Sequence, residues 1–227
     1  MYNLTPNSDL AAEHPIFTDR YLRPAGRFFY QSSIEAIKMM LAAVVLDFMA
    51  TNALYGTKLA PRRVWQIAVR DPFIEEIGFR GLVQSGIGLI QEGVSRYVIQ
   101  RELTPREKEL QKLVRIHLTA FIFAAAHFNV NYSITNFRIK NLVYCYVSSV
   151  VYSHLKENHK TLSLPYLFHG TGNVIALYFS IAPTLTSKRI CEGAVYANLA
   201  CALALANSEW LHACVRDAWH HIYPIHS

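Results

Sequence analysis

Three groups of polar residues lie inside otherwise apolar stretches of this chain, and their spacing suits acid–base chemistry. They are Glu75-Glu76-x-x-x-Arg80, Phe123-x-x-x-His127 and His169-x-x-x-Asn173. Residues four apart share one face of a helix, so Glu76 and Arg80 can form an ion pair. Glu75 points about 100° away from that face. An arginine that neutralises one carboxylate leaves the other free to act as a general base.

Taken singly, each group also has an ordinary structural explanation. An i,i+4 pair such as Glu76 and Arg80 is common on solvated helix surfaces. A lone histidine on an apolar helix, such as His127, is more often a core residue than a catalyst. The pair His169 and Asn173 could form a polar stripe between packed helices. Small residues adjoin both histidines and allow close helix approach, so His127 is expected deep within helix packing.

The segments that carry these groups predict the fold. The chain has 227 residues, of which 52% are hydrophobic and 17% charged, against about 25% charged in a typical soluble domain. Its mean hydropathy is +0.16. Six apolar segments approach the length of a membrane span, which is about 17–25 residues. They cover about 34–56, 72–93, 113–130, 139–155, 164–183 and 191–207.

Together these segments predict an all-α fold, a polytopic transmembrane bundle of about six helices with the three motifs on core helices. The expected organisation is a polar, interfacial lead-in, a transmembrane helical domain and a C-terminal tail. These parts cover residues 1–33, 34–210 and 211–227.

The net charge of +6 is distributed in short basic runs between the apolar segments, at 62–70, 96–115 and 187–189. We expect these runs to be connectors, with the termini on the cytoplasmic side. Nucleic-acid binders more often gather their charge on one face, so no nucleic-acid partner is expected. Within the long charged run, Thr104-Pro105 predicts the start of a helix.

The order of the three motifs, each on its own apolar segment, resembles the CAAX-protease and bacteriocin-processing family. These are intramembrane proteases related to the Ras-converting enzyme, also called the ABI family. The run SLPYLFHGTGN at 163–173 looks like the family's approach to its last motif. The resemblance covers about residues 70–183, which it implies to be the catalytic core of the transmembrane domain.

The resemblance implies an intramembrane endopeptidase and a catalytic role for four residues. In such an enzyme Glu75 and His127 would activate a water molecule. His169 and Asn173 would stabilise the oxyanion of the tetrahedral intermediate. The remaining motif residues would position and pack the site: Glu76, Arg80 and Phe123.

Two mechanisms fit these residues. Glu75, His127 and His169 form a two-histidine, one-carboxylate set that can hold zinc with one position open. The chain has no HExxH motif, and a glutamate with a histidine can handle the water without metal. The metal-independent mechanism, without a cofactor, is therefore favoured, and zinc is the alternative.

The resemblance also sets the expected partners and location. The partners are the lipid bilayer and a membrane-anchored protein or peptide substrate. The location is a multi-pass integral membrane protein of the bacterial cytoplasmic membrane. Two other classes remain open: a non-catalytic membrane scaffold or bacteriocin immunity protein of the same fold, and a soluble helical enzyme or binder.

Overall fold

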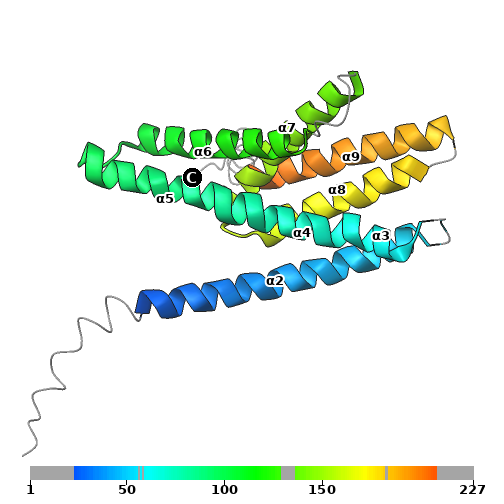
Figure 1. Cartoon of the computed structure of the whole chain (residues 1–227), viewed down its shortest axis with the longest axis horizontal. Helices are drawn as coiled ribbons and strands as arrows, with labels where there is room; N and C mark the ends of the chain where they lie inside the picture. The colour runs from blue at the N-terminus through cyan, green and yellow to red at the C-terminus, as the bar shows by residue number, and fades with distance from the viewer. Residues whose placement is uncertain (1–22, 56, 58, 129–135, 182–183, 209–227) are drawn as a thin grey trace, which may run out of the picture.

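The computed structural model describes residues 23–55, 57, 59–128, 136–181 and 184–208, and all regular structure in these ranges is helical. It forms six helical rods (Figure 1), which confirms the all-α class and the expected number of helices. The tail at 211–227 and residues 1–22 of the lead-in lie outside the described residues. The rods are α2 (Arg23–Ala53), a composite helix from Pro61 to Ile99, α6 (Pro105–Ala126), α7 (Asn136–His159), α8 (Ser163–Ile181) and α9 (Leu185–Ala206).

The composite helix alternates between α and π winding. Its parts are α3 (Pro61–Trp65), η3 (Gln66–Arg70), α4 (Asp71–Glu75), η4 (Glu76–Val83), α5 (Gln84–Val94) and η5 (Ser95–Ile99). π-helical turns are uncommon and occur often at functional sites. Glu76 and Arg80 both lie in η4.

The basic run 62–70 is part of this helix, so its expected role as a connector is wrong. Pro61 occupies the first turn, where its missing N–H has no intrahelical acceptor. Val64, Ala68 and Val69 then face the protein interior, while the arginines of the run stay exposed. The run is amphipathic, and its charge lies on the outer face of a helix.

Pro72 leaves one backbone carbonyl of the composite helix without a helical partner. In η3 the Asp71 N–H donates to the carbonyl of Gln66, which is the i→i−5 pattern of a π-helix. The next donor in that pattern would be residue 72, and proline has no N–H. The acceptor left over is the carbonyl of Ile67. The Asn173 side-chain nitrogen of α8 donates to it at 2.9 Å.

α8 packs very closely on this opened stretch and on α2. The Tyr166 hydroxyl donates to the Val69 carbonyl at 3.3 Å. Gly170 makes the approach feasible, because a Cβ there would lie 2.7 Å from the Ala68 carbonyl oxygen and would also meet the Leu46 side chain. Such distances are shorter than real Cβ contacts, so α2, η3 and α8 fit together only with glycine at this position.

α6 begins where the sequence predicts. Thr104 caps the helix by accepting from the Glu107 N–H at 3.3 Å, and the Glu107 carboxylate accepts from the Thr104 N–H at 2.8 Å. This reciprocal capping box satisfies two otherwise unpaired backbone donors. Hydrogen bonds from Arg101 and Thr104 lower the pKa of Glu107 to about 2. α6 starts eight residues before the expected apolar segment and includes part of the charged run 96–115.

Within the described residues, one helix is long and apolar enough by itself to cross a membrane. This helix is α9, and only 12% of its most apolar window is buried within the protein. α2 begins at Arg23, inside the stretch 1–33 that the sequence assigns to the lead-in.

Candidate active site

Two adjacent glutamates stand in different environments where α4 passes into η4. Glu75 is the last residue of α4 and Glu76 the first of η4. The Glu75 side chain is 26% exposed, whereas the Glu76 side chain is fully buried. The two carboxylates therefore differ in access to water although their residues are neighbours.

Glu76 lies in a fully buried ionic contact. Its Oε1 atom is 3.2 Å from Nη1 of Arg80, and both side chains have no exposed surface. This is the ion pair that their spacing predicts. The same Oε1 atom lies 2.8 Å from Nδ1 of His169. Because a carboxylate only accepts, we assign the hydrogen of this bond to Nδ1 of His169.

His127 lies at the end of α6, not within it. It is the C-cap residue, with its side chain 34% exposed, so the expectation of a histidine deep in helix packing is wrong. Its Nδ1 atom lies 2.8 Å from the Phe123 carbonyl, one of the last acceptors of the helix. The Nδ1 atom is therefore the donor, and neutral His127 presents an unprotonated Nε2.

Both histidines turn their Nε2 atoms toward one oxygen of Glu75. The distances to Glu75 Oε2 are 3.4 Å from His127 and 3.6 Å from His169. Since each Nδ1 already donates to another acceptor, the Nε2 atom of each neutral imidazole is an acceptor that faces the carboxylate. Glu75 is thus placed to exchange protons with either imidazole or with a water bound beside them.

Phe123 packs against Arg80 and against both histidines of the site. Its ring is buried, and the Arg80 guanidinium carbon lies 4.5 Å from the ring centroid in a cation–π contact. The His127 ring centroid lies 4.2 Å from the Phe123 centroid, and the His169 ring meets its edge at 6.0 Å. One phenylalanine therefore limits the positions of both histidines.

A comparison with protein families agrees with this geometry. The family described as type II CAAX prenyl endopeptidase Rce1-like matches residues 60–175, just over half of the chain. The chain belongs to this family. Its members are membrane endopeptidases, and the matched range includes all three motifs. No curated protein and no solved structure matches the chain.

The structure brings together most of the residues that the sequence groups into the family's site. Glu75, Glu76 and Arg80 of the composite helix meet His127 and Phe123 from the end of α6 and His169 from α8. Asn173 lies one helical turn beyond His169 on the same face of α8, and its amide donates to the Ile67 carbonyl.

In the alternative zinc set, His127 and His169 both lie close to the third member, Glu75. In the described ranges, however, no group of three or more His, Cys, Asp or Glu side chains is arranged to hold a metal ion. The absence of a cofactor stays a prediction.

Two residues of α7 that complete the site are absent from the sequence interpretation. The Tyr152 ring stacks on His169, with centroids 5.5 Å apart. The Ser149 hydroxyl accepts from Arg80 Nη2 at 2.7 Å. Ser149 and Ser153 are four apart in an apolar segment, the same signal that identifies Glu76 and Arg80.

Proposed function

We propose that this protein is a multi-pass membrane endopeptidase that hydrolyses a peptide bond of a membrane-associated protein or peptide. One observation carries the proposal: two imidazole nitrogens approach a single oxygen of Glu75, while the neighbouring carboxylate of Glu76 is paired with Arg80. The protein thus presents the partly exposed side chain of Glu75 beside two histidines, and one of these, His169, also contacts the buried carboxylate of Glu76.

In this proposal a water molecule binds beside Glu75 and His127, within hydrogen-bond reach of both side chains, and attacks the scissile carbonyl carbon. Glu75 accepts the proton of the water as the new C–O bond forms, and later gives it to the leaving amine. The bond from His127 Nδ1 to the Phe123 carbonyl fixes the tautomer, so Nε2 can accept from the water and orient it.

His169 and Asn173 are the proposed donors to the oxyanion. His169 can donate from Nε2 only when its ring carries both protons, because Nδ1 already faces Glu76. Asn173 has a second amide hydrogen besides the one on Ile67, and the proposal assigns that hydrogen to the oxyanion.

The outer surface of the helices supports a bilayer location. Large apolar side chains of α2 are exposed along one continuous face, and contact with lipid would bury them. They are Ile37, Met40, Leu41, Val44, Val45 and Phe48. The composite helix also exposes Leu82, Leu89 and Ile90. Recovery of the expressed protein in the membrane fraction tests this part of the proposal, and recovery in the soluble fraction would contradict it.

The catalytic part is tested with purified protein in lipid vesicles and a library of tagged membrane peptides. Glu75→Gln is expected to lower peptide cleavage by about 10²–10⁴-fold, the usual contribution of a general base. His127→Ala is expected to lower it as well. Glu92→Gln, on an exposed position of the same composite helix, is the matched control and is expected to cut like the wild type.

Two outcomes would redirect the proposal. If the wild type resides in the membrane and cuts no peptide, the scaffold or immunity role replaces catalysis. If cleavage is lost with chelator and restored by zinc, the metal-dependent mechanism on Glu75, His127 and His169 replaces the metal-independent one.

A further inference from the structure

A second polar feature leads away from the candidate site into the protein interior. Glu76, Arg80 and Gln84 follow each other at intervals of four on the composite helix, and all three are fully buried. Ser149 and Ser153 of α7 face them, also fully buried. We call the buried stripe formed by these five residues the polar column. Such a stripe is costly in an apolar bundle unless every group has a partner.

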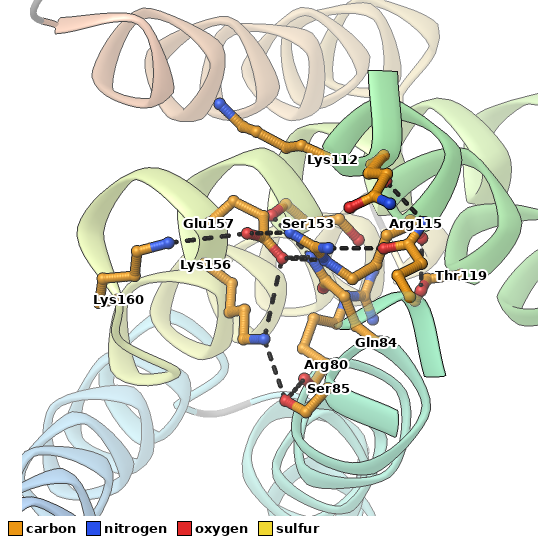
Figure 2. A network of polar contacts seen from close by, with 12 residues as sticks. Arg80, Gln84, Ser85, Lys112, Arg115, Thr119, Ser153, Lys156, Glu157 and Lys160 are labelled. Carbon is orange, nitrogen blue, oxygen red and sulfur yellow. Dashed lines mark hydrogen bonds and ion pairs between the residues drawn. The ribbon is translucent and has the colours of Figure 1, made fainter. Parts of the chain in front are cut away.

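The two helices are joined along the polar column by direct hydrogen bonds (Figure 2). Arg80 Nη2 donates to Ser149 Oγ at 2.7 Å, and one turn further Gln84 Nε2 donates to the Ser153 carbonyl at 3.2 Å. Gln84 Nε2 also donates to Glu157 Oε1 at 2.8 Å. The polar column therefore runs from the Glu76 carboxylate to Glu157 near the end of α7.

At Glu157 the polar column opens onto a charged cluster that reaches the protein surface. Arg115 of α6 donates to both oxygens of Glu157 at 2.8 Å. Lys156 donates to Ser85 at 3.1 Å, and Lys160, 79% exposed, lies 3.7 Å from Glu157 (Figure 2). The interior stripe is thus continuous with solvated charge at this end.

The direct contacts leave several groups of the polar column without a hydrogen bond. In the part of the chain that the structure describes, the buried side-chain atoms without a hydrogen-bond partner are Glu75 Oε2, Glu76 Oε2, Arg80 Nε, Arg80 Nη1, Gln84 Oε1 and Ser153 Oγ. All six belong to the polar column or to Glu75 beside it. They include acceptors, donors and one hydroxyl that can do both.

Leaving a buried polar group unpaired is unfavourable, and more so when the group is charged. A buried water typically makes about three hydrogen bonds to such groups. Arg80 Nε can donate to a water, and Gln84 Oε1 and Ser153 Oγ can accept from one. Their complementary roles are what a bound water requires, whereas an apolar ligand would satisfy none of them.

We propose that the polar column binds ordered water between Arg80, Gln84 and Ser153 and admits the hydrolytic water to Glu75 from the end at Lys160. The second half of this statement rests on the proposed function. Peptide hydrolysis consumes one water per bond, and large apolar side chains are exposed on α2 and on the composite helix. The polar column supplies a hydrated route from the charged surface to the carboxylate.

The first experiment measures water directly and does not depend on activity. Nitrogen-15-labelled wild-type protein in lipid bilayers is studied by water-edited solid-state NMR. Arg80 Nε and the Gln84 side-chain amide are expected to receive water magnetisation about as fast as exposed Arg101. The backbone amide of Leu46, buried in the apolar core, is the dry reference. Transfer to Arg80 and Gln84 as slow as to Leu46 would overturn the proposal.

The second experiment tests delivery of the water. Gln84→Leu removes the polar atoms of the side chain, and is expected to lower kcat about tenfold at unchanged KM. Ser153→Val serves if Gln84→Leu does not fold. Gln111→Leu, a partly buried amide outside the polar column, is the matched control.

The results separate this inference from the proposed function. A folded Gln84→Leu variant with wild-type kcat would overturn the delivery role. A wild-type protein that cuts no peptide would refute the proposed function and with it the delivery role, while the NMR result would still decide whether the polar column binds water.

Discussion

The composite helix is held differently on its two sides. Toward α2 and α8 it meets a close apolar core, in which Leu46 and Gly170 leave no room for another atom. Toward α6 and α7 it presents Arg80 and Gln84 to buried polar partners. The packed side fixes the position of the composite helix, and the polar side places charged groups in the interior of the protein. Glu75 lies where the two sides meet, between His169 of α8 and His127 of α6.

The polar side is expected to give the largest loss of stability when broken. Arg80→Met leaves the buried Glu76 carboxylate without its cation, and removing one partner of a buried pair costs about 3–5 kcal/mol. Denaturant unfolding of the purified protein in detergent measures the loss. Arg70→Met, at an exposed pair with Asp71, is the control and should change stability by less than about 0.5 kcal/mol. Equal losses for both variants would show that the polar side contributes no more than a surface.

The packed side is broken by a single methyl group. Gly170→Ala places a Cβ against the Ala68 carbonyl and Leu46, so α8 must move away from η3. Overpacking of this kind costs about 1–3 kcal/mol. In Gly86→Ala nothing lies within 4 Å of the added Cβ, and the change should be neutral or stabilising by up to about 1 kcal/mol. The thermal midpoints of the two variants test the difference, and a Gly170→Ala variant as stable as Gly86→Ala would contradict the close fit.

Asn173 lies on the packed side, where it joins α8 to η3, and a double variant can separate its two proposed roles. Asn173→Ala leaves the Ile67 carbonyl unpaired and should cost about 1–3 kcal/mol. Pro72→Ala restores an N–H that can donate to the same carbonyl, so the double variant should regain part of this stability.

Activity then completes the test of Asn173. If the amide also contacts the oxyanion, the restabilised double variant stays slow. If cleavage returns together with stability, Asn173 only positions α8 on η3.

The smallest expected effect lies outside both sides, at the start of α6. Glu107 has an ordinary pKa of 4.5, and its bonds to Arg101 and Thr104 lower the value to about 2. Its contribution to stability is therefore complete above pH 4.5 and is lost as the pH falls toward 2. Wild-type helicity followed by circular dichroism should fall over this window more than that of Glu107→Gln. Identical acid profiles would show that the capping box contributes little.

The helical class, the number of helices, the start of α6 at Thr104 and the family were all predicted correctly from the sequence. The pairing of Glu76 with Arg80 was predicted from the sequence as well. Each of these follows from apolar periodicity, from contacts between residues three or four apart, or from the order of the motifs along the chain. Contacts of this kind are fixed by the helix geometry itself and need no knowledge of which helices are neighbours.

Which helix faces meet is visible only in the tertiary structure. There His127 lies at the end of α6, and Asn173 donates to the carbonyl left free by Pro72. Ser149 and Ser153 of α7 lie beside Arg80 and Gln84 in the polar column. These contacts join residues far apart in the chain, so they depend on the crossing of helices and on the local switch to π winding at η3 and η4. The hydropathy pattern predicts neither the helix crossings nor the π winding, because both arise when the helices pack.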